Sequence, residues 1–436
     1  MTELPPPKIF TRDQHPISRN NIDREALKVL YRLRDAGYSA YLVGGGVRDL
    51  FLGKTPKDFD ISTNARPGEL RKLFKSSRVI GRRFRLVQVF FRGNNVIEVS
   101  TLRCRSEHDI DGPDQVLQAN NTYGSVAEDA FRRDLTINSL FYEIENFTVI
   151  DYVGGVADLQ SRIIRIVGDP ARRIRRDPVR MMRALRHAAR SGFTIEEKTW
   201  QAILEHADHL KQCPDSRIRD ELLKDLRGGA SRAWSELAMD SGLLPILIPL
   251  YRPEVIAKTR ERIFSCLSVA DRLQAGGAIL PEHLLLSLFL LPWAEKELNV
   301  LAAPIKGQEG FKFARTLRTR LDEALKDLNI KRVQKESITG LLSNLPVFIK
   351  HAKDHELPKW LTRKSFFKDG LQFYRLFVET TGGPPAEVEI ENPLDEQPRK
   401  KRMSRSRNTG SRAPAFTNTR GGIFGLKRND RPKRNQ

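Results

Sequence analysis

Cysteines, acidic residues and long apolar runs are all scarce in this chain of 436 residues. Its three cysteines, Cys104, Cys213 and Cys266, lie far apart in sequence. This spacing excludes a disulfide framework and a CxxC metal knuckle, and it indicates a reducing compartment. The most apolar stretch, Leu284–Leu291, has eight residues, well short of the ~20 that span a bilayer, and residues 1–10 show no apolar signal region. We therefore expect a cytoplasmic protein without a membrane-spanning segment.

The shortage of acidic residues leaves a strong positive charge. Lys and Arg number 75 against 54 Asp and Glu, which gives a formal net charge of +21. Residues 399–436 hold 13 of these basic residues, Lys400, Lys401 and Arg402 among them, and a single acid, so this segment carries +12 of the total. Such a charge favours nucleic acid over membrane as a partner, because a basic arm binds any phosphate backbone through counterion release.

The apolar pattern divides the chain into four segments. Residues 1–20 are rich in proline and lack periodicity, which predicts a flexible lead. Helix-type and strand-type patterns alternate over 21–155, which predicts a compact α+β domain with a small mixed sheet. The pattern is helical from 156 to 382, and 383–436 have the composition of a disordered basic tail. The expected strands are residues 40–43, 58–62, 86–92, 96–101 and 147–152.

Two carboxylates in the second of these strands, Asp58 and Asp60, point to chemistry. Residues i and i+2 of a strand project from one face, and like charges held side by side are costly unless a cation lies between them. Glu98 interrupts a β-branched run in another expected strand and could complete a site for a hard cation. A turn facing solvent for the aspartates, and an edge-strand glutamate facing water, are the alternatives.

A glycine run, Gly44–Gly46, precedes Arg48 at the end of the first expected strand. Backbone without side chains lets amide groups approach a polyphosphate, although an ordinary strand-to-helix turn has the same pattern. The run lacks the Gly-Lys-Ser/Thr of a Walker loop and the third glycine of a dinucleotide fingerprint. Further along, Arg133, Asp134 and Asn138 combine a cation, an acid and an amide suited to phosphate and ribose, or to a capped helix start.

Eight arginines and one acid occupy positions 172–190. Like charges at helical spacing repel each other, so this density predicts a phosphate-rich partner. Asp177 and Arg180 share a helix face and could offer an acceptor and donors to one base edge. Alternatively, Asp177 before Pro178 is a good helix N-cap.

Together these segments resemble the class II nucleotidyltransferases, the family of bacterial poly(A) polymerases and CCA-adding tRNA nucleotidyltransferases. The matching segments are 42–63, 96–104, 128–142, 151–160 and 177–193, in the family's order. The resemblance implies a catalytic head (21–155), a helical neck for base selection and RNA binding (156–230), a helical body (231–382) and a disordered basic tail (383–436).

The resemblance also implies roles for single residues. Asp58 and Asp60 would hold two Mg²⁺ ions, with Glu98 as the third catalytic carboxylate. The nucleotide ATP would be bound by two groups of residues, Gly44, Gly45 and Arg48 at the triphosphate, and Arg133, Asp134 and Asn138 at ribose and phosphates. Asp177 and Arg180 would select the base. RNA would meet Arg82, Arg83, Arg85, Arg183 and Arg186, together with Lys400, Lys401 and Arg402 of the tail.

The segment Gly81–Arg85 (GRRFR) and the basic tail resemble the poly(A) polymerase branch. The expected reaction is template-independent transfer of AMP from ATP to RNA 3′ ends, with release of pyrophosphate, in RNA polyadenylation and decay. The expected protein is a monomer acting on mRNA and small RNA, with tRNA and the RNA-decay machinery as further candidate partners. CCA addition to tRNA and non-catalytic RNA binding are the alternatives.

Overall fold

The computed structural model describes residues 4–81, 85–104, 123–303, 307–351 and 357–387. The predicted RNA-binding residues Arg82 and Arg83, and Lys400, Lys401 and Arg402 of the tail, lie outside the described residues.

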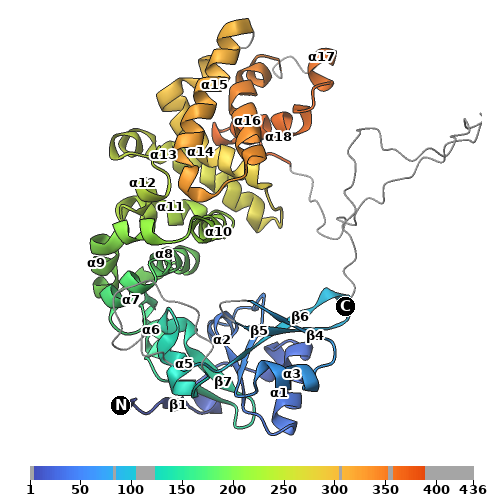
Figure 1. Cartoon of the computed structure of the whole chain (residues 1–436), viewed down its shortest axis with the longest axis vertical. Coiled ribbons are helices and arrows are strands. Elements are labelled where there is room, and N and C mark those ends of the chain that lie inside the picture. The colour runs from blue at the N-terminus through green and yellow to red at the C-terminus, as the bar shows by residue number, and fades with distance from the viewer. Residues whose placement is uncertain (1–3, 82–84, 105–122, 304–306, 352–356, 388–436) are drawn as a thin grey trace, which may run out of the picture. The chain divides into compact units, whose positions relative to one another are not determined.

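Within the described residues, a sheet of eight strands forms the head (Figure 1). Its strand order is β1-β8-β7-β2-β3-β6-β5-β4, and β3 and β6 are parallel whereas the other neighbouring strands are antiparallel. The bounds are β1 Lys8–Phe10, β2 Ala40–Val43, β3 Asp60–Thr63, β4 Ser77–Ile80, β5 Leu86–Phe90, β6 Val96–Thr101, β7 Leu140–Glu143 and β8 Thr148–Asp151.

Helices α1 Arg24–Asp35 and α3 Pro67–Leu73 pack against the sheet, and α2 Gly45–Phe51 and α5 Val126–Arg132 complete the head. Helix α1 begins after Asp23, whose side chain accepts hydrogen bonds from the backbone N–H groups of Glu25 (2.9 Å) and Ala26 (3.1 Å) and so caps the helix. Its residues Ala26, Val29, Leu30 and Leu33 are buried in the core that includes the sheet. This packing fixes the strands that carry the site.

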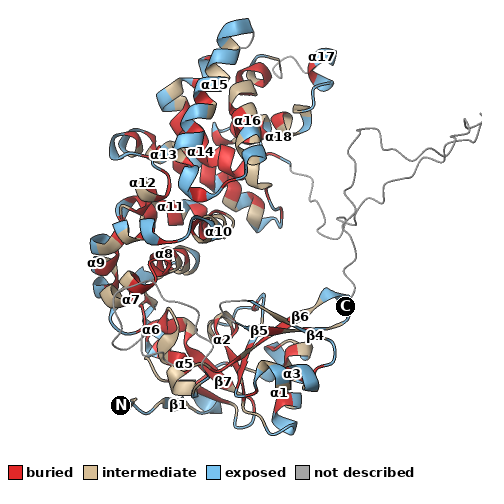
Figure 2. Cartoon of the chain, viewed as in Figure 1, coloured by how far each residue is buried: buried red, intermediate tan, exposed pale blue. Residues whose placement is uncertain are grey.

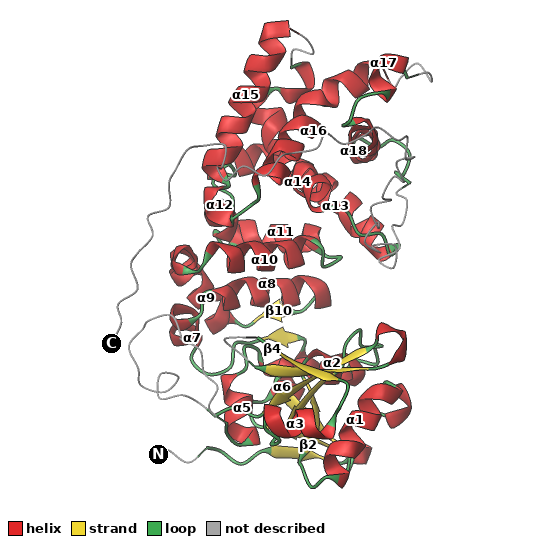
Figure 3. Ribbon diagram, turned by 45° about the vertical axis from the view of Figure 1, so that its right-hand side comes forward, coloured by secondary structure: helices red, strands yellow, loops and turns green. Residues whose placement is uncertain are grey.

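Beyond the head, the described residues are mainly helical, as Figure 3 shows in red. The neck contains α6 Gly155–Ser161, α7 Pro170–Arg176, α8 Val179–Ser191, α9 Glu197–His206 and α10 Asp215–Leu226. The body contains α11 Ser231–Asp240, α12 Leu243–Leu247, α13 Pro253–Ala275, α14 Glu282–Leu298, α15 Gly307–Ala324, α16 Arg332–His351, α17 Lys359–Thr362 and α18 Phe367–Thr380. Short 3₁₀ turns are η1 Arg12–Gln14, η2 Arg19–Asn21, η3 Arg92–Asn94, η4 Thr136–Asn138, η5 Ala207–Gln212, η6 Val300–Ala302 and η7 Lys326–Leu328.

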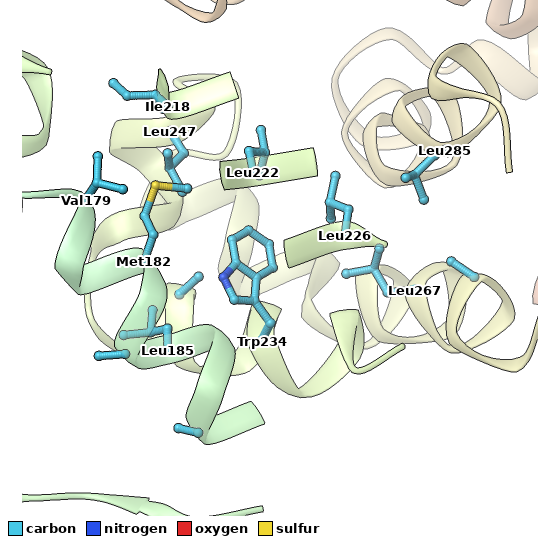
Figure 4. Packing of buried hydrophobic residues seen from close by; sticks show 14 of the residues in the cluster. Val179, Met182, Leu185, Ile218, Leu222, Leu226, Trp234, Leu247, Leu267 and Leu285 are labelled. Carbon is cyan, nitrogen blue, oxygen red and sulfur yellow. The ribbon is translucent and has the colours of Figure 1, made fainter. Parts of the chain in front are cut away.

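Apolar packing joins neck and body. Trp234 of α11 is 1% exposed and lies among Met182 and Leu185 of α8 and Leu226 of α10 (Figure 4). Buried residues follow the faces by which the helices contact one another (Figure 2). The apolar run Leu284–Leu291 is the buried middle of α14. None of the helices in the described ranges is long and apolar enough to cross a membrane.

The α+β class, the mixed sheet and the helical body are confirmed, with three corrections. Residues 1–20 are not wholly a flexible lead, because β1 pairs with β8 and Ile17 is 1% exposed. The neck is not wholly helical, because the two-residue strands β9 Ile163–Ile164 and β10 Thr194–Ile195 pair in parallel. Ordered chain continues past 382, since Ala386 is buried and its N–H donates to Glu379 Oε2 (2.8 Å).

Candidate active site

The predicted carboxylates gather at β3 and β6, two neighbouring strands in the middle of the sheet. Asp60 is the first residue of β3, and Glu98 of the parallel strand β6 is its direct partner, so both side chains project from the same face. Asp58 lies two residues before β3 begins, and not on the strand as the sequence indicated. The Gln88 amide donates to Glu98 Oε1 (3.0 Å) and orients that carboxylate. A glutamate turned toward water at a free edge is therefore not what the structure contains.

The surroundings of Asp60 disfavour its ionised form. Asp60 is reached by solvent, but the protein atoms crowded around it remove part of its hydration. This loss, together with the charges of Glu98 and Asp58, raises the pKa of Asp60 to about 6, while Arg133 acts in the opposite direction. A carboxylate held in an unfavourable ionised state is suited to receiving a cation.

The donor set fits Mg²⁺, which prefers oxygen ligands. No group of three or more His, Cys, Asp or Glu in the part of the chain that is described has the geometry to hold a metal unaided. Mg²⁺ in phosphoryl-transfer sites typically takes one or two carboxylates and completes its shell with water and substrate phosphates. Asp58 and Asp60 meet that requirement, and Glu98 lies beside them.

The glycine turn brings bare backbone close to these acids. Gly44 precedes α2 with φ of 69° and ψ of −140°, a conformation open essentially to glycine. A Cβ atom at Gly44 would stand 3.6 Å from Asp60 Oδ2 and 3.8 Å from Arg133 Nη1. At Gly45 it would stand 3.4 Å from Arg48 Nη2. The glycines therefore keep side chains out of the space between the acids and the two arginines.

Both of these arginines are fixed by neighbours. Arg48 donates through Nη2 to Asp49 (2.7 Å) and through Nη1 to Asn138 Oδ1 (2.8 Å). Arg133 donates through Nη2 to Asp129 (2.8 Å) and to Ser62 Oγ (3.2 Å). Oriented guanidinium groups bind phosphate oxygens with little further loss of side-chain entropy.

Asp134 forms ion pairs with arginines of the neck. Arg180 Nε donates to Asp134 Oδ1 (2.8 Å), and Arg183 Nη1 donates to Oδ2. Burial alone would raise the pKa of Asp134, but Arg180, Arg183 and Arg173 hold it well below its ordinary value. The predicted ribose contact of Asp134 stays a prediction, whereas its part in joining head to neck is seen directly.

The predicted base-selecting residues are also paired within the protein. Asp177 is 8% exposed and Arg180 is 5% exposed. Asp177 makes no cap bond to α8 and instead binds Arg217, whose Nη1 lies 2.6 Å from its Oδ1. Arg180 Nη1 stands 4.0 Å from Asp177 Oδ2, so the two do share a face as predicted. To read a base they would have to exchange these partners, and base selection stays a prediction.

Two arginines of the arginine-rich segment, Arg183 and Arg186, are paired with carboxylates of the protein. Arg186 is 9% exposed and donates to Asp225 Oδ1 (2.7 Å) and to Glu221 Oε2. Arg183 Nη2 also donates to Glu221, at 3.2 Å. Burial raises the pKa of Asp225 to about 8 despite Arg186. Burial would also raise that of Glu221, but Arg186 and Arg183 lower it to about 2. RNA binding by Arg183 and Arg186 stays a prediction, since carboxylates of the protein already occupy their donors.

A pocket of about 670 Å³ lies next to the acids. Five of the predicted site residues line it, namely Gly45, Arg48, Asp58, Asp60 and Arg186. Its lining also includes Arg190, one of the eight arginines of positions 172–190, and three basic residues that sequence reasoning missed, Lys57, Lys224 and Arg227. Lys224 and Arg227 lie outside the segments that the sequence singled out, and the fold alone brings them to the acids. Arg85 is exposed at the start of β5 and does not line this pocket.

Comparison with known proteins identifies the architecture. The family model described as "Poly A polymerase head domain" matches residues 40–165, and "Probable RNA and SrmB- binding site of polymerase A" matches residues 192–254. The chain is 37% identical to poly(A) polymerase I of Escherichia coli O157:H7 over 439 residues, covering 93% of this chain and 92% of that protein. The chain belongs to the poly(A) polymerase family. Its members and their CCA-adding relatives are nucleotidyltransferases, as the sequence indicated.

This poly(A) polymerase family member is also similar to CCA-adding enzymes, both in sequence and in structure. The CCA-adding enzyme of Lactobacillus helveticus is 41% identical over 220 residues, covering 50% of this chain and 54% of that one. The structure of the Bacillus stearothermophilus CCA-adding enzyme in complex with CTP superposes with a TM-score of 0.61 at 25% identity, covering 83% of this chain and 79% of that one. The CCA-adding relatives in sequence thus match half of the chain, and the poly(A) polymerase matches nearly all of it.

Proposed function

We propose that the protein is a template-independent poly(A) polymerase that adds AMP from ATP to RNA 3′ ends and releases pyrophosphate, in RNA polyadenylation and decay. The observation that carries the proposal is the similarity to poly(A) polymerase I over 93% of this chain and 92% of the relative. The acids on β3 and β6, the glycine turn and the basic pocket are the parts that this reaction requires.

Asp58 and Asp60 would hold the two Mg²⁺ ions, and Glu98 would add a third negative charge beside them. When bound, such ions activate a hydroxyl nucleophile and neutralise a leaving phosphate. The protein's own part is to position the reactants. Arg48 and Arg133, both oriented by neighbouring side chains, would bind the triphosphate oxygens, and the absence of a side chain at Gly44 would leave room for them. The raised pKa of Asp60 is the physical support for the metal assignment.

RNA binding is supported by the family match at residues 192–254 and by the basic lining of the pocket. We assign the phosphates nearest the 3′ end to Arg190, Lys224 and Arg227, and the more distant backbone to the tail. A monomer, a cytoplasmic location and contact with the RNA-decay machinery complete the proposal.

CCA addition is the second candidate, because the superposable structures are CCA-adding enzymes and because Asp177 and Arg180 would serve ATP and CTP alike. A product-length assay separates the two. Purified protein receives Mg²⁺, ATP or CTP, and either a generic RNA or a tRNA that lacks its CCA end.

Long adenylate tails on both RNAs with ATP alone are the expected result. Addition that requires CTP and stops after three nucleotides on tRNA would replace poly(A) polymerase by CCA addition. Absence of any addition, with RNA binding retained, would favour the non-catalytic alternative.

A further inference from the structure

His187 of the neck helix α8 contacts two residues of the head beside the nucleotide pocket. Its Nδ1 lies 3.3 Å from Arg48 Nη1, and its Nε2 lies 3.3 Å from Asn138 Nδ2. Arg48 Nη1 also donates to Asn138 Oδ1 (2.8 Å). The three side chains therefore form a closed triangle, and each of them contacts the other two.

This triangle contains one N–H donor too many. Arginine offers only donors, a neutral imidazole offers one donor and one acceptor, and a primary amide offers one acceptor oxygen and an NH₂ group. When Nδ1 accepts from Arg48, the proton on Nε2 faces the Asn138 NH₂ group. When the amide is turned over, its oxygen accepts from Nε2, but the NH₂ group then faces Arg48. When the proton sits on Nδ1 instead, it faces Arg48 directly.

Protonation of the ring would only add a further donor, and the surroundings oppose it. Burial, together with the positive charges of Arg48, Arg186 and Arg190, lowers the pKa of His187 to about 3, so the ring is neutral at physiological pH. Asp134 acts in the opposite direction and does not outweigh them. An oxygen acceptor from outside the triangle is what would satisfy the remaining N–H.

We propose that His187 is a positioning residue that turns the Asn138 amide so that its surplus N–H donor meets a ribose hydroxyl of the incoming nucleotide. Arg48 fixes Nδ1 as the acceptor, so Nε2 keeps the proton and drives the NH₂ group out of the triangle. A ribose hydroxyl suits a neutral amide, because each can both donate and accept, whereas phosphate oxygens are drawn to Arg48 and Arg133. The inference rests on the proposed function in that a nucleotide occupies the pocket.

Substitution by phenylalanine separates this role from simple packing. His187→Phe retains an aromatic ring of similar volume and removes both nitrogens, whereas His187→Gln retains one acceptor and one donor. A ring that only fills space would tolerate phenylalanine at least as well as glutamine. A ring that orients Asn138 would be replaced by glutamine and not by phenylalanine.

The test is equilibrium binding of ATP, 2′-deoxyATP and 3′-deoxyATP to the full-length chain, with single-nucleotide addition to RNA measured in parallel. In the wild type, loss of the hydroxyl that Asn138 contacts should weaken binding about tenfold, as expected for one buried hydrogen bond. His187→Phe should bind ATP about tenfold more weakly and should no longer distinguish the deoxy analogue. His187→Gln should recover most of the discrimination, and His209→Gln, on the 3₁₀ turn η5, is the control with unchanged binding.

A double-mutant cycle with Asn138→Ala tests whether His187 acts through the amide, because the two changes should then be non-additive. Unchanged ribose discrimination in His187→Phe, or additive losses in the cycle, would overturn the inference. Should the phenylalanine variant fail to fold, His187→Leu carries the same comparison. Altered ribose binding without RNA extension would instead refute the polymerase function and leave the role of His187 standing.

Discussion

Replacement of Asp60 by asparagine should stabilise the metal-free protein while it abolishes activity. The rise in the Asp60 pKa from 3.8 to about 6 means that the ionised carboxylate is less favourable in the folded chain than in the unfolded one. The full shift corresponds to roughly 3 kcal/mol, and because Asp60 is reached by solvent, screening reduces this cost to about 1 kcal/mol. Asparagine has nearly the same shape and carries no charge, so it removes that cost.

The pH dependence has a definite sign. Well below pH 3.8 Asp60 is protonated in both states, so the cost is absent there, and it grows as pH rises from the unfolded pKa of 3.8 toward the folded pKa of about 6. The Asp60→Asn variant should therefore gain about 1 kcal/mol in free energy of unfolding at pH 8 and about half of that at pH 5. Urea unfolding in EDTA at the two pH values measures the difference.

Addition of Mg²⁺ should reverse the order of stability. A ligand that binds only the folded state stabilises it by mass action, so the wild type should gain stability with Mg²⁺ and the variant should not. Asp35→Asn, at an exposed residue far from the site in the fold, is the matched control. Equal or lower stability of Asp60→Asn in EDTA, or RNA extension by the variant, would refute the argument that Asp60 is held ready for a cation.

Three further predictions concern other parts of the chain. Gly44→Ala should cost about 1–3 kcal/mol in thermal or urea unfolding because of the positive φ, and Gly68→Ala, with free space around it, should not. Asp134→Asn should cost on the order of 3 kcal/mol, because Arg180 would lose its carboxylate partner in a buried position; a loss below 1 kcal/mol would contradict a structural role for that pair. Truncation after residue 398 should weaken RNA binding and flatten its dependence on log salt by about 0.7 per lost phosphate contact, and an unchanged slope would show that the tail does not touch RNA.

Local patterns made much of the fold predictable. Strands β2 and β6 have the expected bounds, and the apolar run Leu284–Leu291 is buried in a helix. Strand β1 was missed because three residues carry too little periodicity to be recognised. Only pairing with β8, some 140 residues later in the chain, makes it a strand.

Part of the candidate site was predictable from local sequence patterns, and part of it was not. Asp60 and Glu98 were predictable, since each is an acid placed within an apolar strand pattern and the side-chain direction of a strand follows from its period. The partners of the arginines were not predictable. Arg180 meets Asp134 and Arg186 meets Asp225 across 46 and 39 residues, and nothing in the local pattern indicates these pairs. The role of His187 was not predictable either, because a single histidine within a run of arginines forms no recognisable sequence pattern.

The sequence by itself determined the class of fold, the carboxylates and the glycine turn, because these depend on residue type and short-range spacing. Only the tertiary structure decided which basic side chains face the pocket and which form ion pairs within the protein. That choice is a matter of long-range packing. Helix α10 brings Glu221 and Asp225 to α8 as partners of Arg186, and it leaves Arg190 and Arg227 at the pocket. A count of charged residues along the chain gives the net charge. The ion pairs formed on folding determine how many basic side chains are available to bind RNA.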